Sequence, residues 1–441
     1  MTGRYSRITG WGKYTPSRIL TNADLEKMVD TSDEWIVTRT GIRERHIVGP
    51  GETNATMSVA ASRQALDVAG LMPKDIELII VATSSPDHFV PAIASEVQYQ
   101  LGAECPAFTI STGCTGFVYA LATAHQFIAT GAYDRVLVIG SEVISMFVNW
   151  QDRNTCVLFG DGAGAVVLEV SNQPSGVQSF VLGSDGSSGN ALIVRGGGCA
   201  YPMSHEMIDD KAMYIEMDGR KVFKFATRVM GEATLEAVEK AGLTLADIDL
   251  LIPHQANLRI IQLAARYLKL PMEKVVVNLD RYGNTSAASI PIAMVEALEE
   301  GRIRDGMNIC MVGFGGGLTW AAAVVGWGQP AQPVEWPLVW RFAPAGRKVS
   351  MAATRLRLQA RQLADVASYH ASSVLLPLYT FAGLHKTGDK KRRIRIVSCV
   401  LLTQHAISPP SIGVPGTQQT DQCPHPNARV ASHIIWPFGI G

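Results

Sequence analysis

The sequence predicts an α/β fold made of two related halves, and two observations support this prediction. First, residues 65–80 and 237–252 share eight identities at a constant offset of 172 residues. Second, continuous apolar runs alternate with helical patterns, which is typical of a sheet covered by helices on both faces and joined by right-handed crossovers. We therefore expect an N-terminal half over 1–172 and a C-terminal half over 173–330.

Each copy of the repeat predicts the same local order of elements. A helix ends in an Ala-Gly-Leu cap, a turn follows, and a buried apolar strand comes next. Strands are expected over five apolar runs, at 77–83, 135–140, 249–252, 275–278 and 308–312. In folds of this kind, functional sites gather at the carboxyl ends of the strands.

The last 110 residues have a different character. Residues 331–441 hold 13 Lys or Arg against 4 Asp or Glu, whereas the preceding 330 residues hold 26 against 35. They contain no repeat and no site motif, so we expect a basic, poorly structured extension. A nucleic-acid-binding module based on Lys390–Arg395 is disfavoured, because aromatic residues are not interleaved with those charges.

Composition limits the possible classes of protein. Hydrophobic residues make up 47% of the chain and charged ones 18%, yet no run approaches the roughly 20 apolar residues of a membrane span. The N-terminus lacks a hydrophobic signal core, so we expect a cytoplasmic protein without membrane contact. Seven scattered cysteines without a Cys-x-x-Cys pair argue against both a zinc site and a disulfide framework.

Cys114 is the strongest candidate for a catalytic residue. Most cysteines are small buried hydrophobes, but Cys114 lies between small neighbours where an apolar strand is expected to turn into a helix. At that junction, unpaired backbone N–H groups and the positive end of the helix dipole favour a thiolate.

His254 and Asn284 each follow a strand of their own. Taken alone, His254 would be a core or capping residue and Asn284 a turn residue. With Cys114 they suit acyl chemistry, in which the cysteine takes an acyl group as a thioester. His254 Nε2 and the Asn284 amide would donate hydrogen bonds to a developing enolate oxygen. Backbone N–H groups of Cys114 and of the glycine run 315–317 would hold the first oxyanion.

At this point the motifs identify a family. Over about residues 4–327 the chain resembles β-ketoacyl-acyl carrier protein synthase III, the initiating condensing enzyme of type II fatty acid synthesis. The resemblance implies a thiolase-like fold with two βαβαβαββ halves in a five-layered αβαβα architecture. It rests on five long motifs in the family's order, which lie at 21–46, 159–165, 253–259, 283–289 and 313–320.

The resemblance also implies a reaction. Cys114 would be acylated by a short acyl-CoA, and His254 and Asn284 would promote decarboxylation of malonyl-acyl carrier protein. The resulting carbanion would attack the acyl-enzyme, giving 3-oxoacyl-acyl carrier protein, CoA and CO2, with no cofactor or metal. Gly316 matches the oxyanion donor beside the Cys114 N–H, and a homodimer is implied. The alternative is a related condensing enzyme that uses another acyl-CoA in secondary metabolism.

Two sets of contact residues follow from the same resemblance. Coenzyme A would be contacted by Trp35, Arg39 and Arg153. The acidic carrier protein requires a local basic patch, and charged residues recur every three to four positions in the helix after His254. The expected docking residues are Lys224, Gln255, Arg259 and Arg266.

The chain departs from the family near the nucleophile, where Thr109, Ser111 and Thr112 replace the usual residues, and this leaves the preferred acyl group open. Either Phe89 or Val90 takes the position that in the family reaches across the dimer into the partner's pocket.

Two other classes of enzyme share part of this pattern. A cysteine protease also orders its residues Cys, His, Asn, but its local cysteine signature is missing. A degradative thiolase would carry a second cysteine near the C-terminal glycine run, and this chain has none there.

Overall fold

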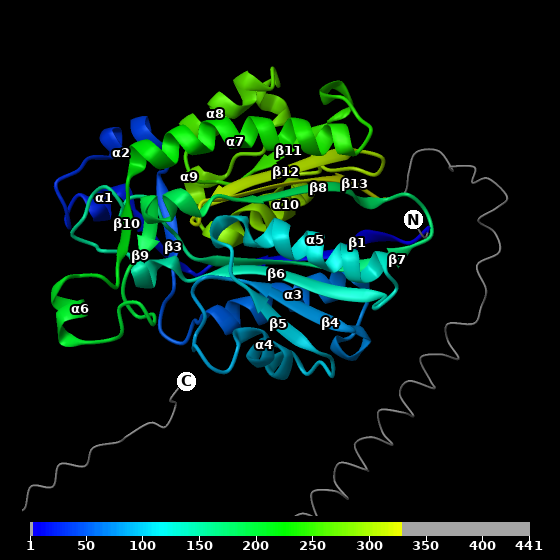
Figure 1. Cartoon of the computed structure of the whole chain (residues 1–441), viewed down its shortest axis with the longest axis horizontal. Helices are drawn as coiled ribbons and strands as arrows, with labels where there is room; N and C mark the ends of the chain where they lie inside the picture. The colour runs from blue at the N-terminus through cyan, green and yellow to red at the C-terminus, as the bar shows by residue number, and fades with distance from the viewer. Residues whose placement is uncertain (1–2, 329–441) are drawn as a thin grey trace, which may run out of the picture. The chain divides into compact units, whose positions relative to one another are not determined.

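Two mixed β-sheets form the centre of the fold (Figure 1). The computed structural model describes residues 3–328, and the basic extension expected over 331–441 lies outside them. The first sheet has five strands in the order β1 (Tyr5–Tyr14), β7 (Gly162–Ser171), β6 (Arg135–Glu142), β4 (Leu78–Ala82) and β5 (Ala107–Ile110). Strands β6, β4 and β5 are parallel, and β7 is antiparallel to β1 and β6.

The second sheet has four strands in the order β11 (Leu250–Pro253), β12 (Asn308–Gly315), β13 (Thr319–Gly326) and β8 (Gly176–Ser184). Strands β11 and β12 are parallel, and the other two pairs are antiparallel. The prediction of a strand at 275–278 is wrong, because this run makes only an isolated bridge between Val275 and Leu251. The chain then turns into the short helix α9 (Leu279–Tyr282), so the pairing does not continue.

Helices form three layers around these sheets (Figure 1). The first sheet is covered on its outer face by α3 (Asn54–Ala69) and α4 (Ile93–Leu101), and the second by α7 (Gly219–Lys240) and α8 (Leu258–Tyr267). Helices α5 (Gly116–Ala129) and α10 (Ser289–Glu299) lie between the sheets. The expected order of five layers, αβαβα, is therefore present.

The composition of a central helix differs from that of an outer helix, as α5 and α8 show. Helix α5 is apolar almost all round, as a helix packed on both sides must be, and Phe117 and Leu121 are fully buried in it. Helix α8, by contrast, buries Ile261, Ala265 and the following Leu268 while its other face is exposed. This is the amphipathic pattern expected from the sequence.

The remaining elements are short and lie beside the sheets. A two-stranded sheet pairs β2 (Arg18–Thr21) with β3 (Glu44–Ile47), and between them in the chain come α1 (Asn22–Leu25) and α2 (Asp33–Thr40). A second pair joins β9 (Leu192–Val194) to β10 (Ile215–Met217), with α6 (His205–Asp209) between them in the chain. No helix within residues 3–328 is long and apolar enough to cross a membrane.

Gly10 provides a test of the packing between β1 and α3. A Cβ atom at this position would overlap the Ala65 carbonyl oxygen, so α3 sits on β1 only because the side chain is absent. We expect Gly10→Ala to lower the free energy of unfolding by about 1–3 kcal/mol, the usual cost of overpacking. Gly186→Ala is the control, since a Cβ there meets nothing within 4 Å. Equal urea midpoints for the two variants would show that this contact does not constrain the fold.

Candidate active site

The three predicted catalytic residues lie at neighbouring chain segments between the two sheets. Cys114 occupies the 3₁₀ turn η2 (Gly113–Thr115), which joins β5 to α5. His254 follows β11 directly, and Asn284 follows α9 and Gly283. Exposed fractions of 8%, 1% and 7% for Cys114, His254 and Asn284 show that all three are buried.

The carboxyl end of β12 brings Cys114 and His254 together. A Cβ atom on Gly313 would lie 3.4 Å from His254 Cβ and 3.8 Å from the Cys114 carbonyl oxygen. A Cβ atom on Gly315 would lie only 2.7 Å from the Cys114 backbone nitrogen. Because these positions carry no side chain, the β12 backbone can pack directly against the nucleophile turn.

Asn284 is fixed by its backbone and by its side-chain oxygen. Its N–H donates to Leu158 O at 2.8 Å and its carbonyl accepts from Gly160 N at 3.0 Å. Its Oδ1 accepts from the Ser286 N–H at 2.9 Å, which leaves the amide NH2 as the group that can donate to a ligand. The preceding Gly283 has φ of 63°, and a Cβ there would lie 2.7 Å from Leu158 O. A residue with a side chain would therefore displace Asn284.

His254 is a buried neutral imidazole. Its Nδ1 lies 2.6 Å from Ser289 Oγ, at the start of α10, whereas its buried Nε2 has no hydrogen-bond partner. Phe314 packs edge-on against the ring, with 5.4 Å between centroids. Burial lowers the pKa of His254 to about 3. The ring is therefore uncharged at neutral pH, with one nitrogen held and the other available.

Burial opposes ionisation of the Cys114 thiol. It raises the pKa of Cys114 to about 12, and the charge of Glu142 acts in the same direction, while the hydrogen bond with Ser286 opposes both. Desolvation therefore acts against the thiolate that the helix start was predicted to favour. The thiol must lose its proton as it reacts.

Glu142 and Ser286 are site residues that sequence reasoning missed. Glu142 is fully buried at the end of β6 and accepts hydrogen bonds from Ser85 Oγ at 2.5 Å, Ser286 Oγ at 3.0 Å and Thr83 Oγ1 at 3.1 Å. Ser286 thus connects this carboxylate to the Asn284 segment, and it lines the same cavity as Cys114. The only local signal was a glutamate just after an apolar run.

A cavity of about 510 Å³ opens beside the nucleophile. Cys114, Gly316 and Ser286 line it, whereas His254 and Asn284 do not. Two of the residues that depart from the family pattern, Ser111 and Thr112, are also in its wall. The other lining residues are Ser84, Gly113, Ile144, Phe147, Phe159, Ser184, Leu192, Ile193, Val194, Ile215, Gly317 and Thr319.

The three residues expected to contact coenzyme A lie together. The guanidinium carbons of Arg39 and Arg153 lie 4.6 and 5.3 Å from the centroid of the Trp35 ring. Arg153 also donates to the Asp30 carbonyl oxygen at 2.8 Å and keeps a side chain that is 45% exposed. The cluster therefore offers an aromatic face and two cations on one surface.

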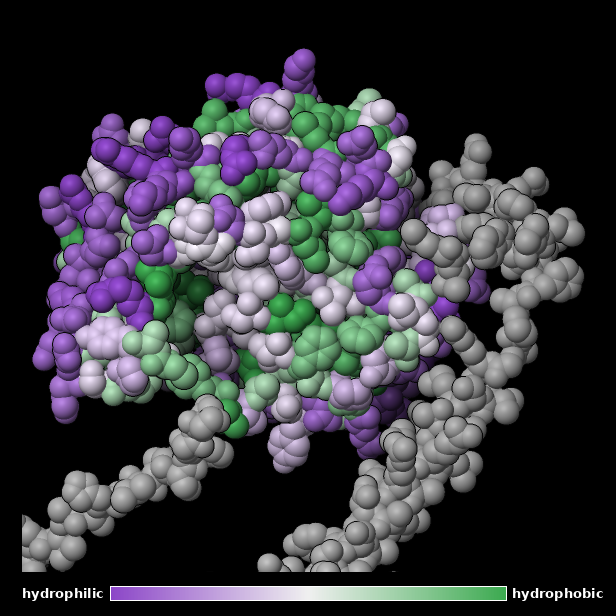
Figure 2. All heavy atoms as spheres, in the orientation of Figure 1, coloured by the Kyte–Doolittle hydropathy of each residue, from purple (hydrophilic) through white to green (hydrophobic). Residues whose placement is uncertain are grey.

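Three of the four expected docking residues are exposed. Lys224 lies on α7, and Arg259 and Arg266 lie on α8, with Arg259 Cζ 5.7 Å from the Phe223 ring. Figure 2 shows hydrophilic residues gathered over these two helices. The prediction that Gln255 contacts the carrier protein is wrong. Gln255 is only 1% exposed, and its side chain donates to Pro253 O and Val276 O and accepts from the Asn278 N–H, so it cannot reach a docking partner.

Among residues 3–328, no three His, Cys, Asp or Glu side chains are placed to hold a metal ion together.

Comparison with known proteins gives consistent matches. The family profile for 3-oxoacyl-[acyl-carrier-protein] synthase III matches residues 108–186, and the profile for its C-terminal part matches residues 238–327. The chain is 55% identical over 323 residues to a beta-ketoacyl-[acyl-carrier-protein] synthase III of Symbiobacterium thermophilum, covering 73% of this chain and 98% of the relative. A relative of the same name from Roseiflexus sp. is 53% identical over 324 residues, with the same coverage.

Solved structures agree with these matches. The crystal structure of 3-oxoacyl-[acyl-carrier-protein] synthase III from Aquifex aeolicus is 48% identical, with a TM-score of 0.69, and covers 73% of this chain and 100% of its own. A priming β-ketosynthase from the R1128 polyketide pathway is 37% identical, with a TM-score of 0.69, and covers 74% and 97%.

The buried neutral His254 predicts a pH dependence of stability. In the unfolded chain the pKa of His254 is about 6.5, whereas in the folded protein burial lowers it to about 3. The stability that the neutral imidazole contributes is therefore fully present above pH 6.5 and is lost as the pH falls toward 3. Between pH 7 and pH 5, we expect wild type to lose about 2 kcal/mol relative to His254→Asn. Urea unfolding of both proteins at each pH measures the difference. Parallel pH curves would contradict the prediction.

Proposed function

Because this chain belongs to the beta-ketoacyl-[acyl-carrier-protein] synthase III family and has its thiolase-like fold, we propose that it catalyses the condensation that initiates fatty acid synthesis. It is an acyltransferase that joins a short acyl-CoA to malonyl-acyl carrier protein. The observation that carries this proposal is the position of Cys114, which lines a cavity at a strand-to-helix junction with His254 and Asn284 at adjoining segments.

The first half-reaction transfers an acyl group to Cys114. The sulfur attacks the thioester carbonyl of acyl-CoA, a new carbon–sulfur bond forms, and CoA leaves as a thiol with the proton that Cys114 loses. The backbone N–H groups of Cys114 and Gly316 stabilise the tetrahedral oxyanion. Support for this pairing is that a Cβ atom on Gly113 would lie 3.1 Å from the Gly316 nitrogen, so the two turns are in contact.

The second half-reaction uses His254 and Asn284. Their Nε2–H and Nδ2–H groups donate to the thioester oxygen of malonyl-acyl carrier protein, so that CO2 leaves and the electron pair is held as an enolate. Its carbon attacks the acyl-Cys114 carbonyl, the carbon–sulfur bond to Cys114 breaks as the 3-oxoacyl product departs, and the cysteine sulfur takes up one proton from solvent. Each such donor typically lowers a barrier by about 3–4 kcal/mol. His254 Nε2 carries the hydrogen when Nδ1 accepts from Ser289.

The substrates are bound by the surface groups described above. Trp35 stacks on the adenine of coenzyme A while Arg39 and Arg153 pair with its phosphates. The carrier protein docks on Lys224, Arg259 and Arg266. The chemistry uses only protein groups and the two thioester substrates, and we place it in the cytoplasm.

We also propose a homodimer. The loop at 86–91 supports it, because the neighbouring apolar residues Phe89 and Val90 are 78% and 87% exposed in the single chain. Large apolar side chains this exposed, side by side in one loop, are suited to burial against a second subunit.

A second candidate is priming in secondary metabolism with a different acyl-CoA. Ser111 and Thr112 favour it, because they make the cavity wall near Cys114 more polar than in the family pattern. The similarity to a polyketide priming ketosynthase fits the same alternative. The two candidates share every catalytic step and differ in the primer.

Intact-protein mass spectrometry after incubation with a panel of acyl-CoAs tests the nucleophile and ranks the primers. We expect wild type to gain the mass of one acyl group and Cys114→Ala to gain none. Cys199→Ala is the control, because Cys199 is an exposed cysteine that does not line the cavity, and this variant should be acylated normally. A wild type that no acyl-CoA modifies would refute the proposed function.

Arg259→Glu tests the docking surface. Reversing this exposed charge should raise KM for malonyl-acyl carrier protein by about tenfold at low salt, with Cys114 acylation unchanged, since steering depends on charge complementarity. The difference should shrink as ionic strength rises. Arg63→Glu, an exposed change on α3, is the matched control and should leave KM unaltered. Equal effects of the two changes would rule out a specific docking role for α8.

A further inference from the structure

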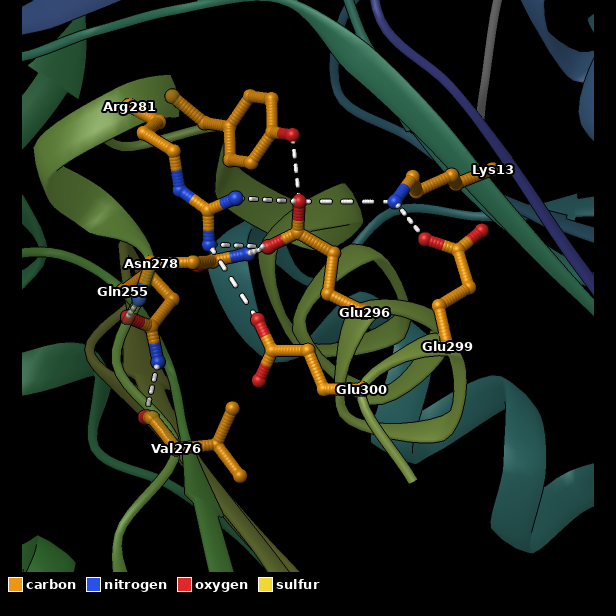
Figure 3. Close-up of polar contacts among 9 residues, drawn as sticks. Lys13, Gln255, Val276, Asn278, Arg281, Glu296, Glu299 and Glu300 are labelled. Atoms are coloured by element: carbon orange, nitrogen blue, oxygen red, sulfur yellow. Dashed lines mark hydrogen bonds and ion pairs between the residues drawn. The ribbon is translucent and has the colours of Figure 1, made fainter. Parts of the chain in front are cut away.

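Glu296 is a buried carboxylate to which the proposed chemistry assigns no role. It lies near the end of α10, is 5% exposed, and is surrounded by hydrogen-bond donors (Figure 3). Tyr282 Oη donates to it at 2.5 Å and Asn278 Nδ2 at 2.8 Å, and Arg281 donates through both terminal nitrogens at 3.1 and 2.9 Å. Lys13 Nζ lies 3.5 Å away.

Three of these four partners belong to one short segment. Asn278, Arg281 and Tyr282 lie within and just before α9, and the Gly283 N–H bonds back to Leu279 O at the end of this helix. Asn284 follows immediately. The Glu296 carboxylate therefore holds the segment that leads to Asn284. Its contact nearest to Asn284 in the chain is Tyr282, two residues earlier.

The same carboxylate is connected to His254 by a second route. Asn278, held by Glu296 through its side chain, donates its backbone N–H to Gln255 Oε1 at 3.0 Å. Gln255 Nε2 in turn donates to Pro253 O at 2.7 Å and to Val276 O at 3.1 Å. Figure 3 shows Gln255 between Asn278 and Val276. Since Pro253 and Gln255 flank His254 in the chain, this network holds the backbone on both sides of the imidazole.

Helix α10 makes both routes part of one rigid element. Its first residue, Ser289, bonds His254 Nδ1 at 2.6 Å, and Glu296 lies two turns later on the same helix. The helix is buried between the sheets, so its two ends cannot shift independently. One end thus holds the imidazole ring, and the other holds the segments that carry His254 and Asn284.

We propose that Glu296 is a positioning residue for the decarboxylation half-reaction, acting through Tyr282, Arg281 and Asn278 on Asn284 and His254. This inference rests on the proposed function. Glu296 itself touches no substrate. Its contacts lie on the His254–Asn284 side of the site, whereas Cys114 is carried by η2 and α5. Glu296 therefore influences the second half-reaction and leaves the acylation of Cys114 unaffected.

The test measures the two half-reactions separately in the full chain. Acylation of Cys114 is followed by mass spectrometry, and the preformed acyl-enzyme is then mixed with malonyl-acyl carrier protein in a single turnover. We expect Glu296→Gln to slow the second step by about tenfold or more, since small misplacements of catalytic groups carry large rate penalties. The acylation rate should change by less than about twofold.

Glu299→Gln is the matched control. Glu299 lies one turn further along α10 and its side chain is 55% exposed. Its carboxylate pairs with Lys13 Nζ at 2.5 Å and makes no hydrogen bond to Asn278, Arg281 or Tyr282. Its removal should change neither rate. Tyr282→Phe provides a milder variant, because it removes one hydrogen bond to Glu296 while the ring stays packed against His46. It should slow the second step selectively even if Glu296→Gln folds poorly.

The outcomes separate this proposal from the proposed function. Wild type that is neither acylated nor condensing overturns both. Active wild type with unchanged single-turnover rates in Glu296→Gln and Tyr282→Phe overturns the positioning role alone. Equal loss of both half-reactions in the two variants also overturns it, because that result indicates a general structural role.

Discussion

The central helix layer is the constraint on which the rest of the structure depends. Helices α5 and α10 are enclosed by a sheet on each side, so they have almost no face for polar side chains. The candidate site residues lie where the chain enters these helices from the end of a strand or a turn. Helix α5 begins two residues after Cys114, and α10 begins at Ser289, which holds His254.

This burial also determines the electrostatics of the site. Burial raises the pKa of Cys114 and lowers the pKa of His254, so it disfavours the charged form of both groups. The buried carboxyl groups of Glu142 and Glu296 are each surrounded by several hydrogen-bond donors. Such an arrangement is costly to disturb, because removing either carboxyl group leaves several buried donors without an acceptor.

Sequence reasoning succeeded where the signal was periodic or repeated. Continuous apolar runs predicted β4 and β6 of the first sheet and β11 and β12 of the second, and the amphipathic pattern of α8 was confirmed. It failed for Gln255, which was predicted from the family resemblance, because the three internal hydrogen bonds that bury its side chain involve Pro253, Val276 and Asn278 and leave no mark in the local sequence. The local pattern around Cys114 does not report how completely the fold desolvates the thiol, so nothing in the sequence indicated the burial that raises its pKa. Glu142, Ser286 and Glu296 were missed because their partners are distant in the sequence or on another element.

The cavity described above has Cys114 in its wall, whereas the imidazole of His254 and the carboxamide of Asn284 do not line it. If the proposed function holds, the residues that surround the acyl chain are then largely separate from the groups that promote decarboxylation, and Cys114 belongs to both sets. Residues of the chamber such as Leu192, Ser111 and Thr112 can diversify in evolution without altering the apparatus for decarboxylation. A lineage with this architecture can change its starter unit while conserving its carbon–carbon bond-forming chemistry.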